Sequence, residues 1–317
     1  MTEPSEPLVE GIATVAPTGE LIPSGAAPEG GDIQVISSGW RLAWREFASN
    51  RLALIALGIL VFFVLFCFLG PIIHPTNQSV TNPLTSDQSP SSAHWLGTDD
   101  NGFDELGRIM IGGRAALEVG FFAAFVAIVL GTVYGAVAGL AGGFLDGLLM
   151  RFVDILLSIP FLLIVLVLAT KWSGTIVEIS LVLAAFSWLV PARLVRGEVL
   201  TLRERDFVWA ARVMGSGRSR LIFRHLIPNA VSVTIVNVTF LIADSILALS
   251  YLGFLGFGLQ YPSTSWGDML GNAQQAISSG YWWLVYPVGV CLVLVVLSCN
   301  LIGDALRDAL DVRLRRR

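Results

Sequence analysis

Charged residues are scarce in this chain of 317 residues. They make up 14% of the sequence, against about 25% in soluble domains. Hydrophobic residues make up 54%, and the mean hydropathy is +0.72. This balance excludes an ordinary soluble globular protein, and we expect an all-α integral membrane protein.

Cysteine and histidine are also scarce, and their positions argue against two kinds of site. Cys67, Cys291 and Cys299 all fall in apolar runs, whereas a disulfide framework needs cysteines in oxidising aqueous regions, so we interpret them as packing residues. His74 and His94 lie far apart, and no H-x-H or H-x₃-H spacing exists. We therefore expect no metal site in this chain.

The sequence also lacks the patterns of nucleotide binding and of catalysis. It contains no G-x₄-G-K-[ST] phosphate loop, and no nucleophile–base pairing stands out. We expect no enzymatic activity, no cofactor in this chain and no nucleic-acid partner.

Six apolar runs are long enough to cross about 30 Å of hydrocarbon at about 1.5 Å per residue. They are Leu52–Ile73, Val119–Leu140, Leu148–Thr170, Ile176–Leu194, Ala230–Phe257 and Tyr281–Ile302. The fourth has a short uncharged core, and Pro191 interrupts its end. An even number of spans predicts that both termini lie on the same side of the membrane.

The basic residues predict which side that is. Seventeen arginines lie beside the termini and two of the inter-span loops, and Arg108, Arg114 and Lys171 lie on the opposite side. Because cytoplasmic loops carry the excess of Lys and Arg, we expect a multi-pass protein of the cell membrane with both termini in the cytoplasm.

The remaining segments complete the predicted organisation. Residues 1–39 contain no Lys or Arg and are rich in Glu, Pro, Gly and Ser, a composition that favours a disordered tail. Residues 40–51 predict an amphipathic helix lying on lipid at the membrane interface. The first span, 52–73, leads to an extracytoplasmic segment, 74–118. A membrane core, 119–302, and a basic cytoplasmic tail, 303–317, follow.

One internal loop, residues 203–229, is more ordered than a linker should be. Phe207, Ala210, Ala211 and Met214 fall at i, i+3, i+4 and i+7, which predicts one face of a short helix. Gly215 then suits the left-handed position that ends a helix. The opposite face carries Arg205, Trp209 and Arg212, beside Asp206 in the first turn. A second short helix, Ser219 to Ile227, is predicted to stop at Pro228. Two packed helices in a loop predict a docking surface.

Four residues within the spans are candidates for a gate or a path. Arg151 and Asp154 are three apart on one helical face and can pair, and Pro160 would kink the same span. These fit a moving gate or a static interfacial ion pair equally well. Asp244 would cost about 2.5–3.5 kcal/mol in hydrocarbon, so it either lines a watery path or bonds to a Ser or Thr of a neighbouring span.

The docking loop resembles the signature loop of ABC-importer permeases, written E-A-A, three residues, G, nine residues, I-x-L-P. The matching residues are Ala210, Ala211, Gly215, Ile227 and Pro228. Trp209 stands where the signature has Glu, and the last element is compressed to Leu226-Ile227-Pro228. Further stretches resemble the dipeptide, oligopeptide and nickel permeases of the C type: 94–100, 150–160, 192–198, 249–253 and 300–311. Within this resemblance Phe103 replaces the usual Arg, Gly107 the usual Ser, and Val312 the final Pro.

The resemblance implies a type I ABC importer permease fold with six transmembrane helices and a cytoplasmic coupling helix in loop 203–229. The residues it assigns to ATPase coupling are Arg205, Asp206, Phe207, Trp209, Ala210, Ala211, Arg212, Met214, Gly215 and Pro228. The chain would form half of a pore beside a second, homologous permease. Two ATP-binding subunits would hold ATP and Mg, and an extracytoplasmic binding protein would deliver the substrate.

Peptide is the favoured substrate, because no His or Cys cluster suited to a transition metal faces outward. Nickel or another small solute remains the alternative. A self-contained secondary transporter is the second class considered; it usually shows internal repeats or several coupled charges, and this sequence shows no convincing repeat and one isolated Asp.

Overall fold

The computed structural model describes residues 39–171 and 174–315, and over these residues the chain is helical, without a β-strand. The predicted tail, apart from Gly39, lies outside the described residues. The helices are α1 (Gly39–Ser49), α2 (Arg51–Ile73), η1 (Pro83–Thr85), α3 (Glu105–Ala141), α4 (Gly143–Leu157), α5 (Phe161–Ala169), α6 (Ile176–Ser187), α7 (Leu189–Leu202), α8 (Asp206–Val213), α9 (Arg218–Arg220), η2 (Leu221–Leu226), α10 (Ile227–Phe254), α11 (Trp266–Asn272), η3 (Trp282–Leu284) and α12 (Tyr286–Arg315). Within the described ranges, four helices are long and apolar enough to cross a membrane, or up to six if each of two bent pairs is one span.

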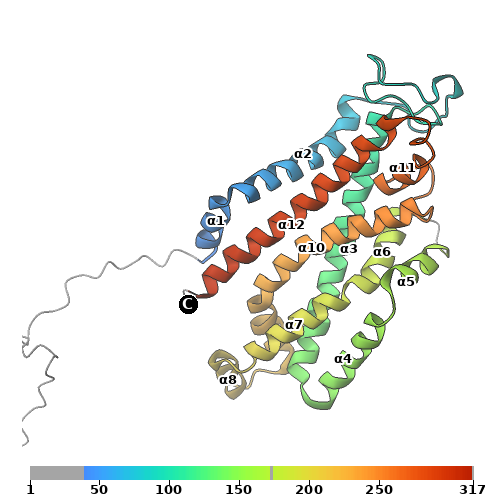
Figure 1. Ribbon diagram of the computed structural model, residues 1–317. Helices are drawn as coiled ribbons and strands as arrows, with labels where there is room; N and C mark the ends of the chain where they lie inside the picture. The colour runs from blue at the N-terminus through green and yellow to red at the C-terminus, as the bar shows by residue number, and fades with distance from the viewer. Residues whose placement is uncertain (1–38, 172–173, 316–317) are drawn as a thin grey trace, which may run out of the picture. The chain divides into compact units, whose positions relative to one another are not determined.

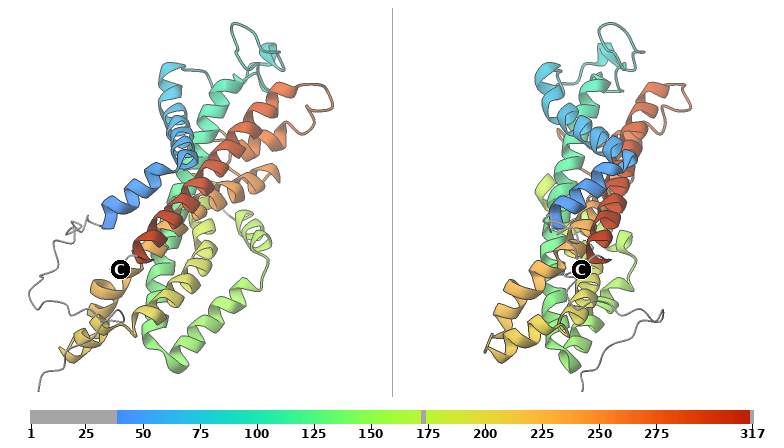
Figure 2. Two further views of the ribbon diagram at one scale, coloured as in Figure 1. Left: turned by 60° about the vertical axis from the view of Figure 1, so that its left-hand side comes forward. Right: turned by 90° about the vertical axis from the view of Figure 1, so that its left-hand side faces the viewer.

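Helix α3 is the centre of the fold. It packs against α2, α6, α7 and α10, and α12 lies between α2 and α10 (Figures 1 and 2). The predicted span Val119–Leu140 is the second part of this helix, which begins at Glu105, inside the segment expected to be extracytoplasmic. Asp104 caps it by accepting a hydrogen bond from the Gly107 N–H.

A helix of 37 residues is about 55 Å long, which exceeds the hydrocarbon thickness of about 30 Å. Its first part carries Arg108, Arg114 and Glu118, and the last two form an ion pair of 2.8 Å. Because charges are costly in hydrocarbon, we expect residues 105–118 to lie outside it, as an extension of the span.

The third and fourth predicted spans are broken helices. Residues 148–170 divide into α4 and α5, which meet at 77°; Pro160 lies in the break directly before α5, so the bend predicted at Pro160 is a break between two helices. Residues 176–194 divide into α6 and α7 at 43°. Pro191 falls in the first turn of α7, where a missing N–H leaves no extra group unpaired, and α7 runs on to Leu202 as the helical spacing of Arg193 and Arg196 predicted.

One predicted helix end was wrong. Pro228 does not stop a helix: α9, η2 and α10 are continuous, and η2 is a π-helical turn in which the Ile227 N–H donates to the Ile222 carbonyl. Pro228 therefore lies in the first turn of α10, where proline is tolerated. Helix α12 continues past the predicted span 281–302 and extends to Arg315, within the segment predicted as a basic tail.

Small residues let the central helices approach closely. Trp266 of α11 is fully buried and donates its indole N–H to the Ile109 carbonyl over 2.9 Å. A Cβ at Gly113 would lie 2.5 Å from that indole ring. Cys67 and Cys299 are buried in the same apolar core, which agrees with their interpretation as packing residues. All three cysteines are free.

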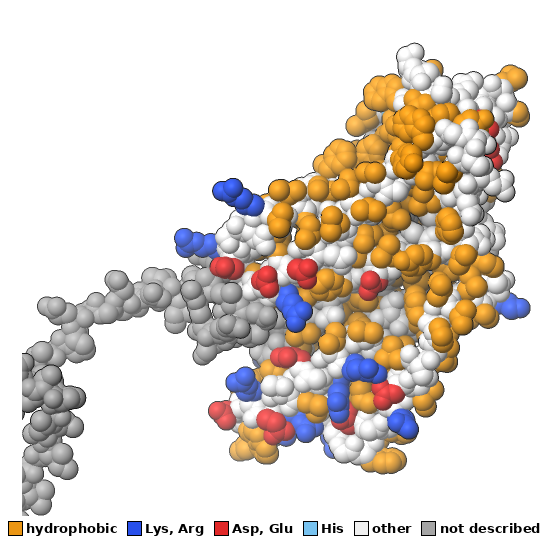
Figure 3. Space-filling model, in the orientation of Figure 1, with side chains coloured by type: hydrophobic (Ala, Val, Ile, Leu, Met, Phe, Trp, Pro, Cys, Tyr) orange, Lys and Arg blue, Asp and Glu red, His pale blue; other side chains and the backbone are white. Residues whose placement is uncertain are grey.

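Helix α1 has a partner that its amphipathic pattern did not reveal. Ala43 and Phe47 are buried in a cluster with Ala305, Ala309 and Leu310 of α12. Figure 3 shows hydrophobic side chains across the middle of the visible face, and a concentration of charged side chains at the end that carries α7, α8 and the turn from α3 to α4.

Candidate functional site

Helix α8 carries the predicted docking residues, and its end has the expected form. Gly215 has φ +82°. Its N–H donates to the Arg212 carbonyl over 2.9 Å, and the Ser216 N–H donates to the Ala211 carbonyl over 3.0 Å. This pair of bonds is a Schellman motif, so the prediction for Gly215 is confirmed.

The packed face of α8 is centred on Val208 and Ala211. Val208 and Ala211 are buried, whereas Phe207 and Met214 are 40% and 79% exposed. Of the predicted stripe of Phe207, Ala210, Ala211 and Met214, only Ala211 is buried. The direction of packing is set by the helices to which α8 is attached, and loop periodicity alone does not contain that information.

The buried face of α8 anchors it to the membrane helices. Val208 and Ala211 belong to one apolar cluster with Ala136 of α3 and with residues of α7 and η2. The other members are Val195, Val199, Leu221, Ile222 and Leu226. A displacement of α8 must therefore move α7 and η2, because a close-packed cluster transmits force rather than yielding.

The outward surface of α8 combines apolar and cationic groups. Trp209 is 51% exposed, and the Arg212 guanidinium lies 5.4 Å from the centre of its ring. Val213 and Met214 are more exposed still. We name Phe207, Trp209, Val213 and Met214 the α8 patch. Aromatic and arginine side chains of this kind are common anchors of protein interfaces.

Ion pairs near the same end join α4 to α7. The Arg196 guanidinium donates two hydrogen bonds to the Asp146 carboxylate, over 3.0 and 2.6 Å. Asp154 pairs with Arg193 at 2.5 Å. The predicted pair of Arg151 with Asp154 is therefore wrong, since the described residues give Arg151 no ion pair. Asp154 reaches a different helix because α7 packs beside α4.

A stripe of glycines on α3 was missed by the sequence interpretation. Gly131, Gly135 and Gly139 face α7, and a Cβ at Gly135 would lie 2.3 Å from the Ala192 carbonyl oxygen. The Arg203 guanidinium donates to the Gly139 carbonyl over 3.1 Å. The repeated G-x₃-G spacing is a known signal of close helix packing in membranes, and it could have found this contact.

The two remaining path candidates occupy different surroundings. Pro160 lies at the break between α4 and α5. Asp244 is exposed on α10 between buried neighbours, Ala243 and Ser245. This exposure shows that Asp244 faces outward from this single chain, and the described residues give it no hydrogen bond to a Ser or Thr of another span. Whether it lines a path stays a prediction.

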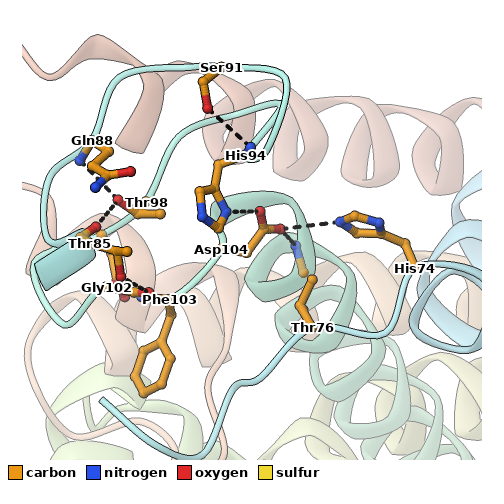
Figure 4. Close-up of polar contacts among 12 residues, drawn as sticks. His74, Thr76, Thr85, Gln88, Ser91, His94, Thr98, Gly102, Phe103 and Asp104 are labelled. Atoms are coloured by element: carbon orange, nitrogen blue, oxygen red, sulfur yellow. Dashed lines mark hydrogen bonds and ion pairs between the residues drawn. The ribbon is translucent and has the colours of Figure 1, made fainter. Parts of the chain in front are cut away.

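At the other end of the molecule, the segment before α3 is held by a short polar network (Figure 4). The Asp104 carboxylate accepts from the Gly107 N–H and lies 2.9 Å from His94 Nδ1. His74 Nε2 lies 3.7 Å away on its other side. The Thr98 hydroxyl accepts from the Gln88 N–H over 2.9 Å. The two histidines therefore help to fix the side chain of Asp104 that caps α3.

Comparison with known proteins gives two family matches. Residues 114–316 match the model of the binding-protein-dependent transport system inner membrane component, and residues 38–90 match the N-terminal transmembrane domain of oligopeptide transport permease C.

Named relatives cover nearly the whole chain. The dipeptide transport system permease protein DppC of Alkalihalophilus pseudofirmus is 37% identical over 93% of this chain and 97% of its own length. The oligopeptide transport system permease protein OppC of Bacillus subtilis is 36% identical over 92% of this chain and 96% of its own. OppC of Escherichia coli K12 is 40% identical over 86% and 90%.

Proposed function

This chain belongs to the family of inner-membrane components of binding-protein-dependent transport systems, and from that membership we propose that it forms half of the translocation pore of a peptide importer. It is a transport permease with the type I ABC permease fold, and is not itself catalytic. Its relatives carry names of dipeptide and oligopeptide permeases, which supports peptide as the substrate over nickel.

ATP binding is assigned to other subunits of the transporter. The chain has no phosphate loop, so ATP and Mg belong in separate subunits, two per transporter, beside a second permease and an extracytoplasmic binding protein. The excess of Arg near α8 favours a cytoplasmic position for that end of the molecule, with both termini on the same side.

The observation that carries the coupling role is the two-sided construction of α8. Its inner face is locked to α3, α7 and η2, while its outer face leaves the α8 patch exposed. The patch seats in a groove of an ATPase subunit, and closure of the ATPases moves α8 as a lever. Because α7 is tied to α4 through the pairs at Asp146 and Asp154, the motion reaches the break at Pro160.

The side chain of Trp209 provides the test of the docking. Trp209→Ala, made in the transporter assembled with its ATPases, should weaken ATPase binding by about 2 kcal/mol, or roughly 30-fold. Co-purification of the ATPases and transport-coupled hydrolysis in proteoliposomes measure this. Trp95→Ala is the matched control, because Trp95 is an exposed tryptophan, at 69%, in the segment at the other end of the molecule. Full assembly and full transport in Trp209→Ala would refute the anchor role.

The substrate is tested in the same proteoliposomes. A labelled dipeptide should accumulate in an ATP-dependent and binding-protein-dependent way, and Ni²⁺ should not. Uptake of Ni²⁺ without uptake of peptide would contradict the peptide assignment and leave the coupling role of α8 intact.

A further inference from the structure

A cavity of about 210 Å³ lies at the end of the molecule opposite α8, between the segment before α3 and the chain that leads from α11 to η3. One wall carries Asp87, Asp99, Asp100 and the first residue of α3, Glu105. The other wall is neutral and includes Asn272. The cavity is separate from the α8 patch and from the path candidates on α4 and α10.

The charges around this cavity do not balance. Among its lining residues four carboxyl groups face one guanidinium, that of Arg108. Arg108 is already engaged: its Nε lies 3.3 Å from the Asp99 carboxylate, and its guanidinium lies 4.8 Å from the centre of the Phe103 ring. Arg108 forms its ion pair with Asp99 and also acts on Glu105 through its charge, so one cation is shared among four carboxyl groups around the cavity.

Glu105 is the most informative of these groups. It is 2% exposed, and its Oε1 atom is buried without a hydrogen-bond partner in the described residues. Leaving such an acceptor unpaired costs about 1–3 kcal/mol. Burial raises the pKa of the Glu105 carboxyl to about 8, with the charge of Asp99 adding to the effect. Glu105 lies outside the hydrocarbon, in the extension of α3 beyond the span, so water and solutes reach this cavity from the aqueous side.

We propose that this cavity binds a primary ammonium group, with the Glu105 carboxylate as its principal acceptor and Asp100 as a second anion. A metal ion does not fit, because no three His, Cys, Asp or Glu side chains among the described residues lie close enough to share one. The volume is below the roughly 300–1,000 Å³ of pockets for drug-sized ligands, so the cavity takes one end of a larger molecule. An ammonium group supplies the hydrogen-bond donors that Oε1 lacks.

The ammonium group has two possible sources, and this part of the inference rests on the proposed function. It is either the amino terminus of a transported peptide or a lysine side chain of the binding protein. The cation site itself does not depend on transport, and a simple amine can therefore test it.

The pH dependence of binding follows from the groups around Glu105. Asp99, Asp100 and Asp104 lie near it, and Arg108 opposes them; Asp268 of α11 faces Arg108 from the other side. The lining side chains from α11 to η3 are uncharged, and among them Tyr281 carries a titratable phenol group. A cation binds the ionised carboxylate, and Glu105 is ionised only above its raised pKa, so affinity increases with pH.

The probe is n-butylammonium chloride, titrated by calorimetry against the assembled transporter in nanodiscs. Because Glu105 is half ionised near pH 8, the dissociation constant should fall about tenfold from pH 6 to pH 7 and about fivefold from pH 7 to pH 8, and should level off near pH 9. Glu105→Gln keeps the size of the side chain but is neutral at every pH, like the protonated carboxyl; it should weaken binding at pH 9 by at least about a hundredfold and remove the pH dependence.

Two further variants leave the buried position 105 unchanged, so they test the proposal even if substitution of Glu105 disturbs folding. Asp100→Asn changes an exposed residue and should weaken binding by a smaller factor. Glu118→Gln changes an acid on the same helix that is paired with Arg114 and does not line the cavity, so its affinity should equal that of the wild type. Equal binding to wild type and Glu105→Gln, or binding of Ca²⁺ in place of the amine, would overturn the proposal.

The source is then decided by two competitions against n-butylammonium. Displacement by Ala-Ala but not by N-acetyl-Ala-Ala assigns the site to the peptide amino terminus. Displacement by the native binding protein but not by its lysine-acetylated form assigns it to a lysine. Both results support the cation site. Neither depends on ATP-driven uptake, so both can be interpreted even if the proposed peptide transport is disproved.

Discussion

At the scale of single residues, Gly215 shows how one backbone angle holds the docking helix in shape. Its φ of +82° lies in the left-handed region, and a Cβ there would meet nothing within 4 Å. Any cost of a side chain is therefore conformational. We expect Gly215→Ala to lower the free energy of unfolding by about 1 kcal/mol and to weaken ATPase coupling, measured by thermal unfolding and by transport-coupled hydrolysis.

The control for this substitution is Gly197→Ala. Gly197 also has open space around its Cα, but it lies inside α7 with a helical backbone. Alanine favours a helix by roughly 0.5–1 kcal/mol over glycine, so this variant should be neutral or slightly more stable. Equal losses in both variants would show that added volume, and not the backbone angle, is responsible.

Trp209 illustrates how a departure from the signature can keep an interface. The signature has Glu at this position, and here a half-exposed indole carries the Arg212 guanidinium over its ring. The side chain at this position points outward, and we expect it to replace the polar contact of the signature Glu by an apolar one with a cation beside it. The groove on the ATPase should therefore be apolar, with acidic residues at its rim.

At the scale of elements, the contact of α3 with α7 depends on the absence of side chains. Gly135→Ala would bring a Cβ to 2.3 Å from the Ala192 carbonyl oxygen, which requires the two backbones to separate. We expect a loss of about 1–3 kcal/mol in stability, measured by thermal unfolding of the assembled transporter. Gly289→Ala in α12, where a Cβ meets nothing within 4 Å, should leave the stability unchanged.

The two ion pairs between α4 and α7 should differ in strength. The Asp146 and Arg196 side chains are 10% and 33% exposed, against 50% and 53% for Asp154 and Arg193. In double-mutant cycles to Ala, we expect a coupling free energy of about 2 kcal/mol for the first pair. For the second we expect about 0–1 kcal/mol, because water and salt screen it. A stronger coupling for the exposed pair would contradict this order.

At the scale of the whole molecule, the surface that Asp244 faces depends on the assembled transporter. It is exposed on α10 in the single chain, and an acid facing lipid would cost about 2.5–3.5 kcal/mol. We expect the surface around it to face the pore. In a background without Cys67, Cys291 and Cys299, Asp244→Cys should react with a charged aqueous thiol reagent in at least one nucleotide state of the assembled transporter.

The matched position for that labelling is Phe62 on α2, which is 58% exposed in a purely apolar stretch. Phe62→Cys should stay unlabelled, because a charged reagent does not enter hydrocarbon. Complete protection of Asp244→Cys in every nucleotide state would remove Asp244 from the path and favour a packed, hydrogen-bonded carboxyl.

The sequence by itself determined the class of this protein, the positions of its apolar spans and the end of α8 at Gly215. Each of these depends on local physics: the length of an apolar run, or the one residue that adopts a left-handed turn at no steric cost. The family followed from motif spacing for the same reason, since spacing is local. The whole docking loop could be located in this way, but not the orientation of its helix.

Tertiary structure alone decided which face of α8 is buried, which arginine pairs with Asp154, and how far α3 and α10 extend. These outcomes depend on which helices become neighbours: Val208 is buried because α7 and η2 lie beneath it, and Asp154 meets Arg193 because α7 runs beside α4. The acidic cavity at Glu105 is the clearest case. Its carboxyl groups and its neutral wall come from segments far apart in the chain, and only the packing of α11 against α3 brings them together.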